Sequence, residues 1–347
     1  MTQPSVRGDS TRSNPNDAEI PLAAKVYSLL VDGKFRSGED LAEQLGVSRS
    51  GVWKAAVTLR ALGVVIHAVR NRGYRLAAPS ELLDAERIRQ GLSRDMRSRL
   101  RQIDVEWSLP STNTTLLARG DLPVGQSDIC LAEYQSAGRG RRGRTWLAPP
   151  GSSICLSMSW QFSEVPRDLG ALSLVAGVCA LRALKIHGVE NIQLKWPNDL
   201  QIEGRKLGGI LIELRAEFGG PTYVVLGIGL NVALGASLMK QIAAAGTEAT
   251  DLKSAGLQSP SRNAIVVSLV NALSHGLIEF EKQGLRAFIE EWRGADALRG
   301  RMVNVLAGEK STRGLARGVD IGGALLVETS EGLQKFVSGE VSVRPEA

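Results

Sequence analysis

The sequence GRGRRGR at positions 138–144 is the segment from which the architecture of this chain can be worked out. Its four arginines repel one another, while the glycines between them permit positive φ angles and let backbone N–H groups approach a ligand. An anion would hold such a loop closed, because the forked donors of arginine fit carboxylate and phosphate oxygens. Taken alone, the run predicts equally a loop over a phosphorylated ligand and a basic loop that is disordered or contacts nucleic acid.

The segment before this loop predicts two strands and a helix. Residues 103–107 alternate in polarity and residues 129–134 are largely apolar, as strands are. Between them, Ser111-Thr112-Asn113 precedes the apolar pair Leu116-Leu117, which predicts the start of a helix. Ser111 or Asn113 would serve as an ordinary helix cap, so the triplet gains a functional interpretation only together with the motifs that follow.

The segment after the loop predicts a strand over 153–160, a buried helix over 169–187, and then KWPND at 195–199, where a strand ends. This cluster combines a cation, an aromatic ring, an amide and a carboxylate, and Lys195 and Lys206 are expected to flank one hairpin. Pro-Asn-Asp is also ordinary turn chemistry. The glycines in the strands that follow, Gly208-Gly209 and GIGLN at 227–231, instead indicate the close approach of backbone or ligand.

Residues 22–30, 37–45 and 48–62 predict three helices near the N-terminus, the second and third capped by Ser37 and Ser48. Two helices joined through a glycine turn, with small and basic residues exposed on the second, are typical of a helix-turn-helix that enters the DNA major groove. The expected DNA-contacting residues are Ser48, Arg49, Ser50, Trp53, Lys54, Arg70 and Arg72.

A hairpin predicted over 64–76 follows these helices, and its Arg70, Arg72 and Arg75 resemble the basic side chains of a wing against the phosphate backbone. Residues 21–78 hold nine Lys/Arg against four Asp/Glu, which is most of the net charge of +6. Such a concentration of positive charge favours a polyanionic partner. The alternative is a small helical domain used for protein contact.

The composition of the whole chain sets further limits. A length of 347 residues with 43% hydrophobic content allows two or three domains. The three cysteines and three histidines share no ligand spacing, which predicts buried reduced thiols and a metal only in company with a nucleotide. No apolar stretch suits a membrane span, and the N-terminus lacks the apolar core of a signal peptide, so we expect a cytoplasmic protein without membrane contact.

The remaining segments carry less information. Residues 1–20 are polar and predict a disordered tail, and residues 77–101 predict a linker with one or two helices. After a helical pattern over 263–293, short strands are expected at 302–306, 313–319, 324–328 and 335–341, which suggests a small barrel.

Five blocks of the central segment, taken in order, resemble the biotin-protein ligase family. They are Ser111-Thr112-Asn113, Glu133-Tyr134-Gln135 with the Arg/Gly run, KWPND, Arg205-Lys206-Leu207 and GIGLN. With the helix-turn-helix in front, residues 21 to about 345 resemble the bifunctional form of this family, which is both biotin operon repressor and ligase. The Arg/Gly and KWPND blocks are highly specific.

The resemblance implies an α+β multidomain fold. Its parts are a tail (1–20), a winged helix-turn-helix DNA-binding domain (21–78), a linker (79–102), a catalytic domain with a mixed sheet (103–294) and an SH3-like β barrel (295–347). The barrel serves packing alone or, as the family suggests, recognition of ATP and the carrier protein.

The resemblance also implies roles for single residues. The biotin-binding positions are Ser111, Thr112, Asn113, Gln135, Gly138, Arg139, Gly140, Arg141 and Lys206. The nucleotide-binding positions are Arg142, Arg144, Trp146, Lys195, Asn198, Asp199 and Asn231. Lys206, Arg139 and Arg141 are the expected catalytic residues, and Asp199 is the expected contact to Mg²⁺.

The implied reaction consumes ATP and biotin. The biotin carboxylate attacks the α-phosphate, pyrophosphate leaves, and a lysine of the biotin carboxyl carrier protein of acetyl-CoA carboxylase then attacks the mixed anhydride. The resemblance further implies repression of biotin synthesis genes through operator DNA, with a homodimer in the adenylate-bound state.

Two other functions fit parts of the sequence. A transcription factor that only senses a small ligand would be expected to have lost some of the catalytic motifs, whereas all five blocks are intact in this sequence. A lipoate ligase shares the fold, and the Arg/Gly loop disfavours it.

Overall fold

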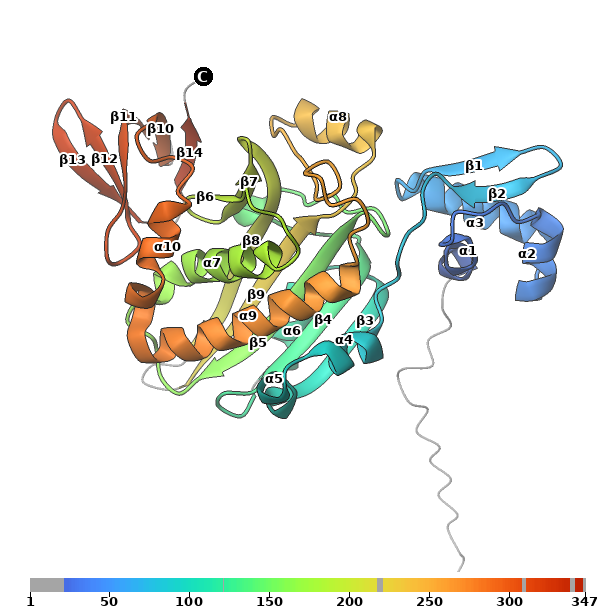
Figure 1. Ribbon diagram of the computed structural model, residues 1–347, viewed down its shortest axis with the longest axis horizontal. Helices are drawn as coiled ribbons and strands as arrows, with labels where there is room; N and C mark the ends of the chain where they lie inside the picture. The colour runs from blue at the N-terminus through green and yellow to red at the C-terminus, as the bar shows by residue number, and fades with distance from the viewer. Residues whose placement is uncertain (1–21, 121, 217–220, 308–309, 338–340, 346–347) are drawn as a thin grey trace, which may run out of the picture.

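The computed structural model describes residues 22–120, 122–216, 221–307, 310–337 and 341–345. A small helical domain and a β sheet lie at opposite ends of a layered α/β core (Figure 1). The predicted α+β multidomain architecture is confirmed. The tail predicted over residues 1–20 lies outside the described residues.

The N-terminal domain is a winged helix-turn-helix. Its elements are α1 (Leu22–Leu30), α2 (Gly38–Leu45), α3 (Arg49–Ala61), β1 (Ile66–Val69) and β2 (Gly73–Leu76). As predicted, Ser37 and Ser48 cap α2 and α3, and each accepts a hydrogen bond from the backbone N–H three residues further on. The three helices meet over buried Val26, Leu41 and Leu59, and β1 pairs with β2 to form the wing.

A seven-stranded mixed sheet is the centre of the molecule. In spatial order it contains β3 (Leu100–Leu109), β4 (Ser127–Gln135), β5 (Ser153–Phe162), β9 (Thr222–Asn231), β8 (Arg205–Ala216), β7 (Asp199–Ile202) and β6 (Gln193–Lys195). β3 and β4 are parallel, and all other neighbours are antiparallel. β5 is buried along its whole length, which means that both faces of the sheet are covered.

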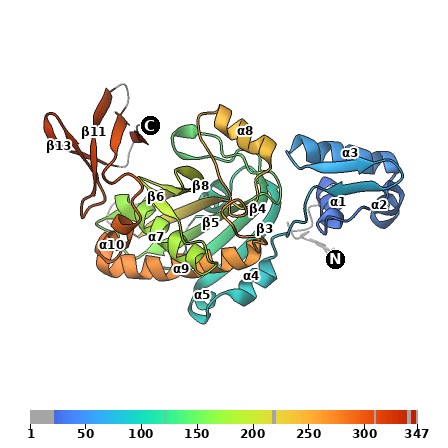
Figure 2. The same ribbon diagram turned by 45° about the horizontal axis from the view of Figure 1, so that its top comes forward.

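Helices form these covering layers (Figures 1 and 2). They are α4 (Ala85–Gly91), α5 (Arg94–Arg99), α6 (Thr112–Arg119), α7 (Leu172–Lys185) and α9 (Arg262–Gln283), whereas α8 (Ala236–Ala244) has no buried residue and covers neither face. α7 and α9 pack on the face to which Leu131 points, and α6 packs on the opposite face with Cys130. Successive residues of a strand point to opposite faces, so one strand serves both layers.

The segment Arg262–Ala287, which contains α9, is the one described helix that is long and apolar enough to cross a membrane by length and composition. Its Leu269, Leu273 and Phe280 are buried in the core, and α9 packs along α7. Burial in the core therefore accounts for its apolar composition.

α10 (Ile289–Gly294) leads into a five-stranded antiparallel sheet. In spatial order the sheet contains β13 (Gly332–Phe336), β12 (Leu325–Thr329), β11 (Lys310–Val319), β10 (Met302–Ala307) and β14 (Val341–Pro345). The prediction of one strand over 335–341 is wrong, because this range holds the end of β13 and the start of β14. A tight turn pairs Thr329 with Gly332 and starts β13 earlier than the sequence pattern indicates.

Tyr27 joins the N-terminal domain to the central domain. Its ring lies 5.3 Å from that of Trp107, and its hydroxyl lies 2.8 Å from Ser80 Oγ and 3.3 Å from the Pro150 carbonyl oxygen. A Cβ at Gly151, where φ is +76°, would lie 2.0 Å from the same hydroxyl, so only glycine fits there. The contact thus reaches the segment that directly follows the Arg/Gly loop.

Asp296 lies between α10 and the C-terminal sheet, and burial raises the pKa of its carboxyl to about 6. Its Oδ1 accepts a hydrogen bond from Leu298 N–H at 2.9 Å, whereas Oδ2 is buried without a hydrogen-bond partner among the described residues. With a raised pKa, the folded protein binds more protons than the unfolded chain. The carboxylate therefore lowers stability as pH rises toward the folded pKa, and the penalty persists above it.

We expect Asp296→Asn to raise the free energy of unfolding near neutral pH by about 1 to 3 kcal/mol. Asparagine keeps the oxygen that Leu298 N–H requires and removes the buried charge. Well below the ordinary aspartate pKa of 3.8 the carboxyl is protonated in both the folded and the unfolded protein, so the gain should vanish there. Unfolding of both proteins across this pH range checks the prediction, and a gain that persists in acid would contradict it.

Candidate active site

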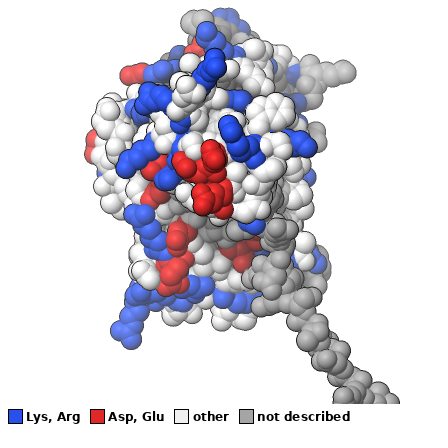
Figure 3. Space-filling model, turned by 90° about the vertical axis from the view of Figure 1, so that its right-hand side faces the viewer, with Lys and Arg blue, Asp and Glu red and all other residues white. Residues whose placement is uncertain are grey.

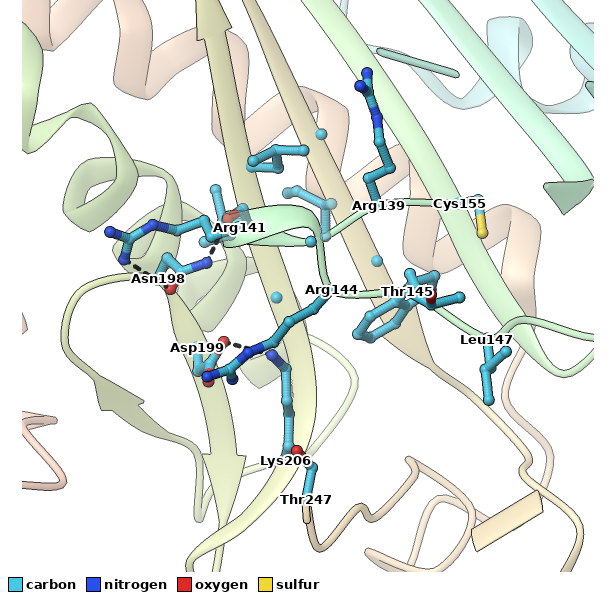
Figure 4. A pocket seen from close by; sticks show the side chains of 18 of the residues that line it. Arg139, Arg141, Arg144, Thr145, Leu147, Cys155, Asn198, Asp199, Lys206 and Thr247 are labelled. Carbon is cyan, nitrogen blue, oxygen red and sulfur yellow. Dashed lines mark hydrogen bonds and ion pairs between the residues drawn. The ribbon is translucent and has the colours of Figure 1, made fainter. Parts of the chain in front are cut away.

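A pocket of about 410 Å³ lies beneath the Arg/Gly loop. The start of α6 lines one end of it, and the short strands β6 and β7 with the start of β8 line the other. Figure 4 shows Arg141 of the loop reaching Asn198, and Arg144 close to Asp199 and Lys206. The structure brings all residues predicted for biotin and nucleotide binding to this pocket except Gly138, which is buried at the base of the loop.

A hydrogen-bonded group of side chains forms the end beside α6. Thr112 donates to Gln135 Oε1 through its backbone N–H at 2.8 Å and its hydroxyl at 3.1 Å. The Ser157 hydroxyl lies 2.7 Å from Thr112 Oγ1 and 2.6 Å from Asn113 Oδ1. A Cβ at Gly227 would lie 2.3 Å from Asn113 Oδ1, so glycine is required for this close approach. Sequence reasoning did not single out Ser157, which occupies a buried strand position without a motif.

The Arg/Gly loop folds back on itself across the pocket. Gly140 N–H donates to Arg144 O at 2.7 Å, Trp146 N–H donates to Gly138 O at 2.9 Å, and Arg142 takes a φ of +58°. Arg141 reaches Asn198 Oδ1 at 3.4 Å. Burial lowers the pKa of the Arg141 guanidinium, while nearby Asp199 raises it.

Trp146 lies flat against β9. A Cβ at Gly229 would come within 2.5 Å of its ring, and the Lys206 ammonium is 5.8 Å from the ring centroid. The indole N–H is buried and has no hydrogen-bond partner among the described residues. The second glycine of the GIGLN block is therefore needed to seat an aromatic ring beside a lysine.

Cations gather at the other end of the pocket. Lys206 Nζ lies 2.7 Å from Asp199 Oδ1, and an adjoining cavity of about 420 Å³ is lined by Arg144, Lys195, Lys206 and Arg344. Burial lowers the pKa of Lys195, as do the like charges of Lys206, Arg144 and Arg344, while Asp199 opposes the shift. Arg344 comes from β14, and no local pattern in the sequence marks it.

The arrangement of Lys195 and Lys206 differs from the predicted single hairpin. Lys195 pairs with Asp199 and Lys206 with Gln201, so β7 lies between the two lysines and forms a hairpin with each neighbour. The backbone thus carries both lysines to one end of the pocket. Asn231 also lines the pocket and donates to Thr250 O at 3.0 Å.

The helix-turn-helix presents its predicted DNA-contacting residues to solvent. Arg49, Ser50 and Lys54 are exposed, and the Trp53 side chain is 55% exposed. Ser48 Oγ is engaged in the helix cap. Figure 3 shows this end of the molecule with basic side chains around a central group of acidic ones.

The wing differs from the prediction at one arginine. Arg70 and Arg72 are exposed, whereas Arg75 is half-buried with its Nε enclosed. The guanidinium of Arg75 lies 5.0 Å from the centroid of the Phe35 ring, and that of Arg72 lies 4.2 Å from it. Arg75 therefore packs within the domain.

Family models match all three parts of the chain. The biotin/lipoate A/B protein ligase family matches residues 107–231, an HTH domain matches 23–75, and the biotin protein ligase C terminal domain matches 299–344. The structure of biotin protein ligase from Aquifex aeolicus in complex with biotin and ATP is similar with a TM-score of 0.59 and 25% identity, over 71% of this chain and all of that chain. The fold and the pocket thus define a ligase of the biotin/lipoate class.

Full-length relatives narrow this class. The bifunctional ligase/repressor BirA of Salmonella typhimurium is 39% identical and that of Escherichia coli 38% identical, each over 94% of this chain and 98% of the relative. A biotin–[acetyl-CoA-carboxylase] ligase of Mycobacterium tuberculosis is 33% identical over 75% of this chain and 98% of that protein. The chain belongs to the bifunctional ligase/repressor family of biotin protein ligases.

Proposed function

We propose that this protein activates biotin with ATP and transfers it to a lysine of a biotin carboxyl carrier protein, and that its N-terminal domain represses biotin synthesis genes by binding operator DNA. One observation supports the proposed ligase activity. A single pocket has a hydrogen-bonding end at Thr112 and Asn113, a cationic end at Lys206, and the Arg/Gly loop across both. A carboxylic acid with a polar head group and a nucleoside triphosphate match these two ends.

In this proposal the biotin head group binds at the end of the pocket beside α6. Ser111, Thr112, Asn113 and Gln135 supply the donors and acceptors that a ureido ring needs. Gly138 and Gly140 let the loop backbone pass close to the ligand, and Arg139 and Arg141 bring positive charge to it. Lys206 then faces the biotin carboxylate.

In the same proposal the nucleotide binds at the cationic end of the pocket. Trp146 offers an aromatic face for adenine, and Asn198 and Asn231 shape the wall of the pocket. Arg142, Arg144 and Lys195 are assigned to the phosphates. The adjoining cavity, which Arg344 also lines, suits the β- and γ-phosphates and the departing pyrophosphate, because it collects cations around a partly buried space.

Mg²⁺ fits this site only together with the nucleotide. The described residues hold no group of three His, Cys, Asp or Glu side chains that could bind a metal. Asp199 is one carboxylate beside the phosphate cavity, and one carboxylate with phosphate oxygens is a usual set of Mg²⁺ ligands. When bound, the ion supplies charge neutralisation for the phosphates.

The proposed mechanism needs no covalent enzyme intermediate. A biotin carboxylate oxygen attacks the α-phosphorus, and the bond to the β-phosphate breaks. The amine of the carrier lysine then attacks the acyl carbon, and AMP leaves. Lys206, oriented by Asp199, stabilises the charge that builds up on the α-phosphate. The closed loop keeps water away from the mixed anhydride.

Transfer of labelled biotin to an acceptor domain tests the enzymatic part. We expect label on the acceptor lysine only when ATP is present, with release of pyrophosphate. The same assay with labelled lipoate in place of biotin separates the two substrates of this class. Transfer of lipoate in preference to biotin would contradict the proposal.

The exposed residues of α3 and the wing support DNA binding. Replacing Arg70 and Arg72 together by alanine should weaken binding to all duplexes alike and reduce the slope of log K against log salt by about 2, because each phosphate contact contributes about 0.9. Anisotropy titrations of a random-sequence duplex at several salt concentrations measure this slope. Arg286→Ala, an exposed arginine of the central domain, is the control, and an unchanged slope in the double variant would contradict the role of the wing.

Two further parts of the proposal concern assembly and place in the cell. The adenylate-bound protein is proposed to form a homodimer, which doubles the DNA contact. We place the protein in the cytoplasm, in keeping with its three free and buried cysteines, whose pKa values burial raises to about 12.

A further inference from the structure

Glu213, on β8, contacts both Asn113 on the pocket floor, which is the end of the pocket beside α6, and Arg139 in the Arg/Gly loop. Its Oε2 accepts a hydrogen bond from Asn113 Nδ2 at 2.8 Å, and its Oε1 lies 3.4 Å from Arg139 Nη2. One carboxylate thus connects a residue placed against the biotin head group with the first arginine of the loop. None of the sequence motifs includes Glu213.

These contacts hold the Asn113 amide in one orientation. Its Oδ1 accepts a hydrogen bond from the Ser157 hydroxyl, and its Nδ2 donates to Leu211 O at 3.2 Å as well as to Glu213. The side chain is buried, and β9 leaves no space beside it at Gly227. A ligand that hydrogen-bonds to Asn113 therefore also affects the hydrogen bond between Asn113 and Glu213.

Arg139 is the more exposed of the two partners of Glu213. Its Nη2 also donates to Thr114 Oγ1 at 2.9 Å, and its side chain is 48% exposed, against 27% for Glu213. An ion pair with this exposure contributes little stability. The Arg139–Glu213 pair can therefore break and re-form as the loop opens and closes, at little cost to the stability of the fold.

We propose that Glu213 is a positioning residue that couples occupancy of the pocket floor at Asn113 to closure of the loop over residues 138–146. The inference rests on the proposed function, in which this loop covers biotinyl-adenylate. Glu213 contacts Asn113 and Arg139 and is not placed at the reacting atoms. Losing its charge should therefore speed release of the adenylate without slowing its formation at saturating substrates.

Trypsin reports loop opening without any catalytic turnover. Arg142 and Arg144 are exposed in the closed loop, but cleavage after them requires the loop backbone to open locally. We expect the full-length Glu213→Gln variant without ligand to be cleaved in the loop about two to five times faster than the wild type. Glutamine can turn its oxygen to Asn113, but it then presents an amide nitrogen to Arg139. Mass spectrometry of the fragments locates the cuts.

Glu290→Gln is the matched control, because it breaks an exposed pair with Arg293 on α10. It should be cleaved at the wild-type rate. Equal cleavage of the wild type and Glu213→Gln would overturn the proposal. This comparison needs no ligase activity, so it tests the role of Glu213 independently of catalysis. Failure of the wild type to form adenylate would contradict the proposed function and not the role of Glu213.

Release of preformed labelled adenylate tests the coupling to Arg139. We expect Glu213→Gln to release it about five times faster than the wild type, with the biotin KM raised and the rate of formation at saturation within about twofold. The double variant Glu213→Gln/Arg139→Gln should release it no faster than Arg139→Gln alone. Multiplied effects would mean that the two residues act independently, which would overturn the proposal.

Discussion

Replacing Lys206 by alanine is expected to slow formation of biotinyl-adenylate by about 10²- to 10³-fold, the usual loss when one positioned charge donor is removed from a reaction centre. Lys206 forms the cationic end of the pocket, where its ammonium lies 2.7 Å from Asp199 Oδ1. In the alanine variant the biotin carboxylate and the α-phosphate would meet without the Lys206 ammonium. The remaining Asp199 carboxylate would add repulsion.

Pyrophosphate release in a single turnover measures this effect. Lys206→Arg keeps the charge with a different shape and should recover part of the rate, whereas Lys185→Ala, at an exposed position near the end of α7, should behave as the wild type. A Lys206→Ala variant that forms adenylate within about tenfold of the wild-type rate would remove Lys206 from the reaction centre.

Replacing Arg262 by leucine is expected to lower the free energy of unfolding by about 3 to 5 kcal/mol, because it leaves a buried carboxylate unpaired. The side chains of Arg262 and Glu133 are 2% and 3% exposed and lie 2.8 Å apart. Arg262 also donates to the carbonyl oxygens of Glu81 at 2.7 Å and Ser153 at 2.8 Å. The pair thus ties the linker, β5 and the start of α9 to β4.

Denaturant unfolding of the full-length chain, followed by circular dichroism, measures this loss. The double variant Arg262→Leu/Glu133→Leu should be more stable than Arg262→Leu alone, since removing both charges leaves neither unpaired. A double variant that is less stable would show that the two residues are not coupled in this way. Because Gln135 follows Glu133 by two residues on β4, weaker biotin binding is expected alongside the lower stability.

Local patterns were sufficient to predict most elements of the fold. Ser37 and Ser48 cap their helices through contacts within three residues of the chain, and the buried helix around α7 follows from its continuous apolar character. The strand boundaries predicted over 335–341 were wrong, because β13 is short and begins directly after a tight turn. The mixed sheet was expected only from the family resemblance, and the order of its strands came from the structure, since strand pairing is a long-range property.

By itself, the sequence determined most of the segments that form the pocket, because the Arg/Gly run, KWPND and GIGLN combine residue types that a core would not need, whereas the lining residues of 242–249 carry no such pattern. The tertiary structure alone decided which side chains meet. Ser157, Glu213 and Arg344 lie at positions without a local pattern and join the site only when β5, β8 and β14 are brought together. Arg75, a surface residue by its pattern, is turned inward over Phe35. Hydrogen bonds and ion pairs act over a few ångströms in space, and the folded chain sets these distances between residues that lie far apart in the sequence.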